Sequence, residues 1–191
     1  MKGRESGMPD EAYWATFFDP EKLLRRLLPA GVHRGDIVEF GCGYGTFTLP
    51  AARSTSGVVT GLDIEPEMVA CVRKKVLEAG VTNVVATVRD FVADGTGLAD
   101  ESQSHAMIFN LLHLEQPLVL LREARRVLMP GASLSVMHWR SDMPTPRGPS
   151  LAIRPSPEQC ATWLHDAAFR SVEPVELEDA SPYHFGLVAS L

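Results

Sequence analysis

Residues 38–46 of this sequence read VEFGCGYGT, and this stretch decides how the rest of the chain is interpreted. Its apolar start indicates the end of a strand, and three glycines, Gly41, Gly43 and Gly45, alternate behind it. Because glycine has no Cβ, the backbone there can turn tightly and approach a ligand closely. We therefore expect a strand, a ligand-binding glycine loop and a helix in that order. A glycine-rich turn that binds nothing is the alternative.

The spacing of the glycines separates two classes of ligand. A dinucleotide is bound by the pattern G-x-G-x-x-G, with its pyrophosphate on the helix N-terminus. Here the sixth position is Thr46 rather than glycine, and Glu39 lies two residues before the first glycine. A carboxylate repels a pyrophosphate and attracts a ligand that carries an ammonium or sulfonium group. The loop therefore favours a cationic ligand over a dinucleotide.

Outward from the loop, short apolar runs alternate with helical patterns. The expected strands span residues 36–40, 57–63, 83–89, 104–111, 133–138, 172–177 and 185–191, and helices are expected at residues 20–28, after the glycine loop, from Pro66 to Gly80, from Pro117 onward and at 157–168. Such alternation indicates a mostly parallel sheet with helices on both faces, whose ligands bind beyond the carboxyl ends of the strands. The last two strands are joined too closely for a helical crossover, so we expect them to pair antiparallel. Residues 129–131, MPG, predict a turn.

The composition is that of a globular domain. The chain has 191 residues, 45% of them hydrophobic, and 18 basic against 24 acidic residues leave a formal charge of −6. We expect one domain over residues 1–191, with an N-terminal cap segment at 1–30 and a proline-rich loop at 141–157. The acidic balance disfavours a nucleic-acid partner, and no apolar run is long enough to span a membrane.

The N-terminus and the cysteines indicate the compartment. The first residues lack the apolar run of a signal peptide. Cys42, Cys71 and Cys160 are odd in number and far apart, which fits neither a disulfide framework nor a zinc site. We therefore expect a cytoplasmic protein without a metal, in which each cysteine is a small buried residue.

Five segments together identify a family. Residues 39–45 (EFGCGYG), 61–68 (GLDIEPEM), 89–91 (RDF), 109–114 (FNLLHL) and 126–132 (RVLMPGA) resemble, in order and spacing, the motifs of class I S-adenosylmethionine (SAM)-dependent methyltransferases. The resemblance spans residues 13–191 and is closest to compact bacterial methyltransferase domains without an inserted substrate domain. It implies a Rossmann-like α/β fold, with a seven-stranded sheet in the order 3-2-1-4-5-7-6 and an antiparallel last strand.

The resemblance also implies which residues bind the cofactor SAM. They are Glu39, Gly41, Gly43, Gly45, Asp63, Ile64, Asp90, Phe91 and Asn110. The glycines would line the methionine and ribose, Glu39 would face the methionine ammonium, and Asp63 would grip the ribose hydroxyls. Asp90 and Phe91 would hold the adenine, and Asn110 would present its carbonyl to the methionine. Alternatives stay open for three of them: Asp63 as a helix N-cap, Asp90 as a plain loop acid, and Asn110 as a strand cap.

Three histidines follow strands that are neighbours in the family's sheet. Methyl transfer is an in-line displacement, so much of the catalysis comes from holding the reactants in line, and a hydroxyl acceptor would benefit from a general base. His113 and His138 are the candidate catalytic residues. With His184 they could hold a metal, but hydrogen-bonded pocket or core histidines are the simpler interpretation. The expected acceptor pocket comprises Tyr13, Trp14, His113, His138, Trp139 and His184.

The sequence leaves the acceptor open. The N-P-P-Y motif of nucleic-acid amino methyltransferases is absent, since the fourth expected strand ends in NLLH at residues 110–113. We therefore expect a small-molecule acceptor. A SAM-binding protein without catalysis, a protein methyltransferase and an NAD(P)-dependent oxidoreductase remain the alternatives.

Overall fold

The computed structural model describes residues 8–30 and 32–191 and places seven strands in one sheet of order β3-β2-β1-β4-β5-β7-β6. The strands are β1 (Ile37–Phe40), β2 (Val59–Asp63), β3 (Val84–Val88), β4 (Gln103–Phe109), β5 (Leu128–Trp139), β6 (Ser171–Val175) and β7 (His184–Ser190). β1 to β5 are parallel, and β7 pairs antiparallel with both β5 and β6. The expected Rossmann-like order and the antiparallel last strand are confirmed.

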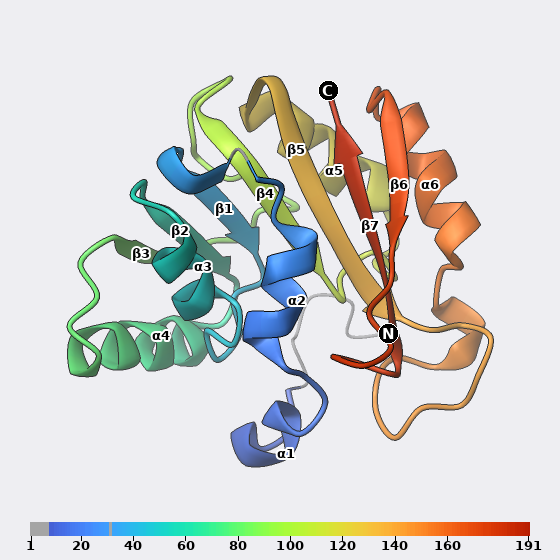
Figure 1. Ribbon diagram of the computed structural model, residues 1–191, viewed down its shortest axis with the longest axis horizontal. Coiled ribbons are helices and arrows are strands. Elements are labelled where there is room, and N and C mark those ends of the chain that lie inside the picture. The colour runs from blue at the N-terminus through green and yellow to red at the C-terminus, as the bar shows by residue number, and fades with distance from the viewer. Residues whose placement is uncertain (1–7, 31) are drawn as a thin grey trace.

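Helices cover both faces of the sheet (Figure 1). They are α1 (Glu11–Ala15), α2 (Pro20–Leu27), α3 (Thr48–Ser54), α4 (Pro66–Glu78), α5 (Pro117–Val127) and α6 (Pro157–Asp166), with short 3-10 turns at Val32–Arg34 and Leu151–Ile153. In this view α2, α3 and α4 lie in front of the sheet, and α5 and α6 lie behind it. None of the helices within the described residues is long and apolar enough to cross a bilayer.

The core follows from the central position of the parallel strands. All four residues of β1 are buried, as expected for a strand with helices on both faces. Along β4 the side chains alternate: Ile108 packs with Leu121 of α5 on one face, and Met107 packs with Leu24 of α2 on the other. Two apolar layers therefore fix the sheet and present the carboxyl ends of its parallel strands to one side.

Two local expectations were wrong. The segment at 129–131 is not a separate turn before a strand but lies inside β5, at a shift of register in which Gln103 pairs Leu128 while His105 pairs Ser133. Gly131 takes φ +78°, so glycine supplies the bend within the strand. The second difference is α1, a helix of five residues that carries Tyr13 and Trp14 in a segment where no helix was expected. The side chain of Asp10 caps it by accepting from the N–H groups of Ala12 and Tyr13.

The N-terminal cap segment and the proline-rich loop also have defined structure. Of the expected cap at 1–30, residues 1–7 lie outside the described residues. The proline-rich loop leads into α6, whose start has a full capping box formed by Ser156 and Gln159. The helix α1 and the proline-rich loop lie at the same end of the molecule as the carboxyl ends of the parallel strands (Figure 1).

Candidate active site

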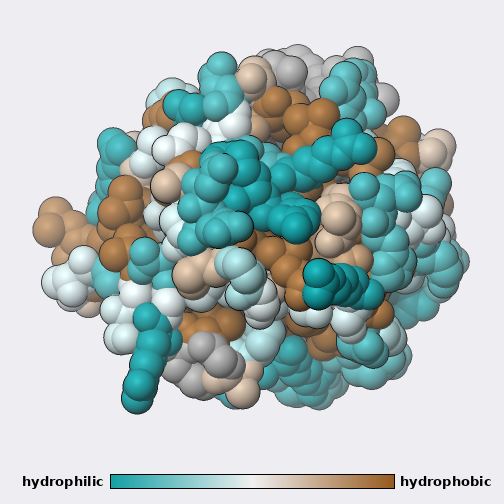
Figure 2. Space-filling view, turned by 90° about the horizontal axis from the view of Figure 1, so that it is seen from above, coloured by the Kyte–Doolittle hydropathy of each residue, from teal (hydrophilic) through white to brown (hydrophobic). Residues whose placement is uncertain are grey.

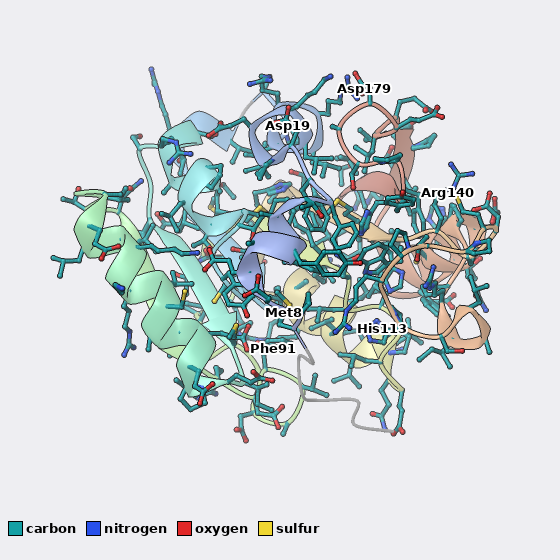
Figure 3. The ribbon with its side chains drawn as sticks, turned by 90° about the horizontal axis from the view of Figure 1, so that it is seen from below. Met8, Asp19, Phe91, His113, Arg140 and Asp179 are labelled. Carbon is teal, nitrogen blue, oxygen red and sulfur yellow. The ribbon has the colours of Figure 1, made fainter. Side chains whose placement is uncertain are left out.

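A cavity of about 340 Å³ opens at the carboxyl ends of the parallel strands. Its lining comprises Met8, Pro9, Trp14, Glu39, Gly41, Cys42, Gly43, Tyr44, Thr46, Phe47, Asp63, Ile64, Arg89, Asp90, Phe91, Val92, Phe109, Asn110, Leu111, His113, Leu114, Trp139, Arg147, Gly148 and Pro149. Figure 3 views this end, with Met8, Phe91 and His113 near the centre and Asp19, Asp179 and Arg140 toward the edge. Figure 2 views the opposite end, where hydrophilic side chains cover most of the face and apolar patches are scattered between them.

Three carboxylates at or just beyond the carboxyl ends of β1, β2 and β3 form one part of the cavity lining, the acidic wall: Glu39, Asp63 and Asp90. Glu39 is only 1% exposed, and its Oε2 accepts a hydrogen bond from Thr48 Oγ1. Desolvation raises the pKa of Glu39 to about 8, although the hydrogen bond from Thr48 opposes the rise. The site therefore holds a buried carboxyl group whose ionised form a cationic partner would favour further.

Asp63 fastens the glycine loop to the end of β2. Its Oδ2 accepts from the N–H of Gly43 at 2.8 Å, and its Oδ1 accepts from the N–H of Glu65 at 3.0 Å. Burial raises the pKa of Asp63, and these two backbone hydrogen bonds act against the rise. No side chain caps the start of α4, so the N-cap interpretation of Asp63 is wrong.

The remaining expected cofactor residues differ in how they meet the cavity. Ile64 and Phe91 line it, and Asp90 does so while its Oδ1 also accepts from the N–H groups of Val92 and Ala93. Asn110 sits at φ +61° after β4, and its Oδ1 is buried without a hydrogen-bond partner among the described residues. Such an orphaned acceptor is rare in proteins and indicates a position for a ligand donor.

The three glycines do not share one role. Gly41 and Gly43 line the cavity, and all three have positive φ, which favours glycine. Gly45 lies away from the cavity wall: a Cβ there would come within 2.9 Å of Leu49 and 3.2 Å of Val72. Gly45 therefore allows the loop to pack closely against α3 and α4.

Aromatic rings form another part of the cavity lining, the aromatic wall: Trp14, Phe47, Phe109 and Trp139. The rings of Trp14 and Trp139 lie 6.3 Å apart, edge to face, and Phe47 meets Phe109 at 4.9 Å. These contacts join α1, the glycine loop, β4 and β5. Of the expected acceptor residues, Trp14, Trp139 and His113 therefore reach the cavity.

Comparison with known proteins identifies the chain. Residues 37–131 match the family model "Methyltransferase domain". A SAM-dependent methyltransferase from Aquifex aeolicus has the same fold with a TM-score of 0.80 and 26% identity, over 95% of this chain and 94% of that one. This chain belongs to the SAM-dependent methyltransferase family.

Two further proteins are similar to this chain. A ubiquinone biosynthesis O-methyltransferase of Xanthomonas axonopodis pv. citri is 33% identical over 116 residues, 60% of this chain and 46% of that relative. The chain thus spans about half the length of that curated relative. A methyltransferase structure from Mesorhizobium loti superposes with a TM-score of 0.69 at 20% identity, over 89% of this chain and 96% of that one, which shows the shared fold.

The other three expected acceptor residues do not line the cavity. Tyr13 is 45% exposed and is not among the residues that line the cavity. His138 is fully buried behind His113, with its Nε2 at 3.2 Å from His113 Nδ1. His184 lies behind Trp139, with ring centroids 4.0 Å apart. Within the described residues, no group of three or more metal-binding side chains converges, and the metal interpretation of the histidines finds no support.

Several residues that line the cavity were not expected from the sequence. Met8 and Pro9 cover the glycine loop, and the hydroxyl of Tyr44 donates to the carbonyl of Pro9 at 2.9 Å. Gly148 lies directly against the ring of Trp139. Nothing in the local sequence marks Met8. The prolines around Gly148 predicted a loop at 141–157. They did not indicate which residue of that loop would line the cavity.

Arg154, also missed, fastens the loop that carries Gly148. Its guanidinium donates to the carbonyls of Arg140 at 2.9 Å, Arg147 at 3.2 Å and Pro149 at 2.8 Å. It also lies 6.0 Å from the ring centroid of Trp139. The partly buried guanidinium of Arg154 therefore holds the proline-rich loop against Trp139 of the aromatic wall.

Proposed function

We propose that this methyltransferase binds SAM in the cavity and transfers its methyl group to a small-molecule acceptor. The observation that carries the proposal is that the same cavity is lined by a buried carboxyl group, Glu39, by the orphaned acceptor Asn110 Oδ1 and by the glycine loop. A buried carboxyl group and an unused acceptor suit a ligand that brings both a positive charge and N–H donors.

The residues present suit this cofactor. The methionine ammonium would lie toward Glu39 and Asn110, and the ribose hydroxyls would donate to Asp63, whose carboxylate is already oriented by the N–H groups of Gly43 and Glu65. Phe91 and Ile64 offer apolar surface for the adenine, beside Asp90. Bound SAM supplies a methyl group on a sulfonium, so the protein needs no covalent intermediate.

The acceptor would bind against the aromatic wall. This wall is closed by Trp14 on one side and by residues 147–149 on the other, which suits a small molecule and excludes water from the reacting atoms. Catalysis would come from holding the acceptor atom in line with the methyl group. The O-methyltransferase relatives favour an oxygen acceptor. The three free cysteines are compatible with a cytoplasmic protein.

Calorimetric titration with S-adenosylhomocysteine tests the cofactor, with NADH as the control ligand. We expect micromolar affinity for S-adenosylhomocysteine and none for NADH. Binding of NADH alone would instead support the alternative of an NAD(P)-dependent oxidoreductase. Release of S-adenosylhomocysteine from SAM that depends on added acceptor then separates an enzyme from a SAM-binding protein without catalysis.

A further inference from the structure

We propose that His113 acts as the general base toward a hydroxyl acceptor through its Nε2, and that His138 is a positioning residue that fixes the tautomer of His113. This inference rests on the proposed methyl transfer. It adds the chemical class of the acceptor, an acidic hydroxyl such as a phenol, and a distinct role for each histidine.

The hydrogen bonds of the two rings determine where the protons lie. His138 Nδ1 is 3.1 Å from the carbonyl oxygen of Trp139. A carbonyl only accepts, so His138 carries its proton on Nδ1 and its Nε2 has a free lone pair. That Nε2 is 3.2 Å from His113 Nδ1, so His113 must donate there from its own Nδ1.

These hydrogen bonds leave the lone pair of His113 Nε2 available to a ligand in the cavity. With the proton of His113 on Nδ1, its Nε2 is an acceptor, and among the described residues it makes no hydrogen bond. His113 lines the cavity, whereas His138 is 0% exposed and cannot touch an acceptor. The fixed carbonyl of Trp139 thus sets the tautomer of the ring that faces the acceptor, through the ring of His138.

His184 cannot take this role. Ser181 Oγ donates to the carbonyl of Phe17 at 2.8 Å, so it accepts from His184 Nδ1 at 2.7 Å. The other nitrogen of His184 is buried without a partner among the described residues, behind Trp139. Of the three histidines at this end of the sheet, His113 is the one that offers a nitrogen to the cavity.

The surroundings keep both rings neutral, as the tautomer argument requires. Burial lowers the pKa of His138 to about 3, and burial together with the charge of Arg154 lowers the pKa of His113. The charged and titratable groups near the pair are Arg154, which fastens the proline-rich loop, Arg147 in the cavity wall and His184 behind Trp139. The charge of Arg154 disfavours a positive charge on the pair, so His113 is neutral at pH 7, with its proton on Nδ1. A neutral ring whose pKa is lowered is a weak base, which suits an acidic hydroxyl such as a phenol.

The step balances without any further reactant. The hydroxyl proton passes to His113 Nε2 as the acceptor oxygen bonds to the methyl carbon. The carbon–sulfur bond of SAM breaks, and its electron pair stays on sulfur. The products are the methyl ether, neutral S-adenosylhomocysteine and an imidazolium at His113, which then releases its proton to solvent.

Nitrogen NMR of the histidine rings tests the tautomer without needing an acceptor. In ¹⁵N-labelled protein at pH 7, we expect His113 and His138 to be neutral with the proton on Nδ1. The free side chain favours Nε2–H, so the signature is distinctive. His138→Leu removes the acceptor and should return His113 to Nε2–H, whereas His138→Gln, whose side-chain oxygen can still accept, should keep Nδ1–H. A proton on Nε2 of His113 in the wild-type protein would overturn the proposal.

Turnover tests the base itself, using SAM with a set of phenols and catechols and a matched set of anilines. We expect phenol methylation whose kcat/KM rises with pH through the His113 pKa measured by NMR. His113→Gln should lose about 10²–10⁴-fold with an unchanged affinity for S-adenosylhomocysteine. His138→Leu should lose about 10–100-fold, and His138→Gln should recover much of that loss. His165→Gln, an exposed histidine on α6, is the control and should behave as wild type.

The outcomes separate this inference from the proposed function. If no phenol is methylated, if anilines react equally well, or if His113→Gln retains full activity, the inference is wrong while SAM binding can still stand. If S-adenosylhomocysteine does not bind to the wild-type protein, the proposed function itself fails.

Discussion

The two walls of the cavity are built in opposite ways. Each carboxylate of the acidic wall lies within or directly after a parallel strand, and its partners are short-range or belong to the adjacent loop, as with Asp63 and Gly43. The aromatic wall instead joins Trp14 to Trp139, which are 125 positions apart in the sequence, through ring contacts and a loop fastened by Arg154. The acidic wall depends on the topology of the sheet, whereas the aromatic wall depends on how distant segments pack.

This difference predicts separable behaviour. Changes in the acidic wall should alter cofactor affinity and its pH dependence, and changes in the aromatic wall should alter the acceptor step alone. A variant of the aromatic wall that weakens cofactor binding, or a variant of the acidic wall that changes the acceptor step alone, would contradict this division.

Glu39→Gln should have the largest effect, on the pH dependence of stability. Burial raises the pKa of Glu39 from its ordinary value of 4.5 to about 8. Below pH 4.5 the carboxyl is protonated in both states. Between pH 4.5 and 8 the unfolded chain releases the proton and the folded protein keeps it, so the free energy of unfolding falls as pH rises, by at most about 1.4 kcal/mol per pH unit.

Denaturant unfolding of the ligand-free protein from pH 5 to pH 8 measures this. The stability of Glu39→Gln relative to wild type should grow with pH, by a few kcal/mol as an order of magnitude. Glu67→Gln, an exposed carboxylate in the first turn of α4, is the control. Parallel curves for wild type and Glu39→Gln would contradict the buried, protonated state of Glu39.

Asp63→Ala should weaken binding of S-adenosylhomocysteine by about 1.5–3 kcal/mol, or roughly 10–150-fold, because it removes charge-assisted hydrogen bonds. It also frees the N–H of Gly43 and loosens the loop. Calorimetry of this variant beside Asp94→Ala, an exposed carboxylate, measures the effect. Unchanged affinity in Asp63→Ala would remove Asp63 from the cofactor site.

Gly148→Ala should have the smallest effect and should be confined to the aromatic wall. Its Cβ would come within 2.8 Å of the Trp139 ring at a backbone φ of +108°, so the loop must shift. We expect the KM for the acceptor to rise about 5–30-fold, since a strained position costs about 1–2 kcal/mol, with unchanged cofactor affinity. Gly131→Ala has a similar φ, +78°, but open space around it, and serves as the control for strain alone. If Gly148→Ala weakened cofactor binding as much as acceptor binding, the two walls would not be independent.

The sequence by itself determined the fold and the acidic wall of this protein. Its motifs resemble those of a family, and that resemblance implied the strand order and the cofactor-site positions of Glu39, Gly41, Gly43, Asp63, Ile64, Asp90, Phe91 and Asn110, all of which line the cavity. The reason is that residues beyond the carboxyl ends of parallel strands meet at one edge whatever the side chains elsewhere. The backbone geometry of the glycine loop is equally local, because it depends on φ alone.

Only the tertiary structure decided the other wall. His113, His138 and His184 all follow or begin neighbouring strands, but only His113 reaches the cavity, because orientation depends on the pleat and on what packs behind each ring. Gly45 has the same sequence signature as Gly41, yet it faces Leu49 and Val72. Contacts such as those of Met8, Gly148 and Arg154 join segments far apart in the chain. No local pattern encodes them, since they arise only when the folded sheet brings those segments together.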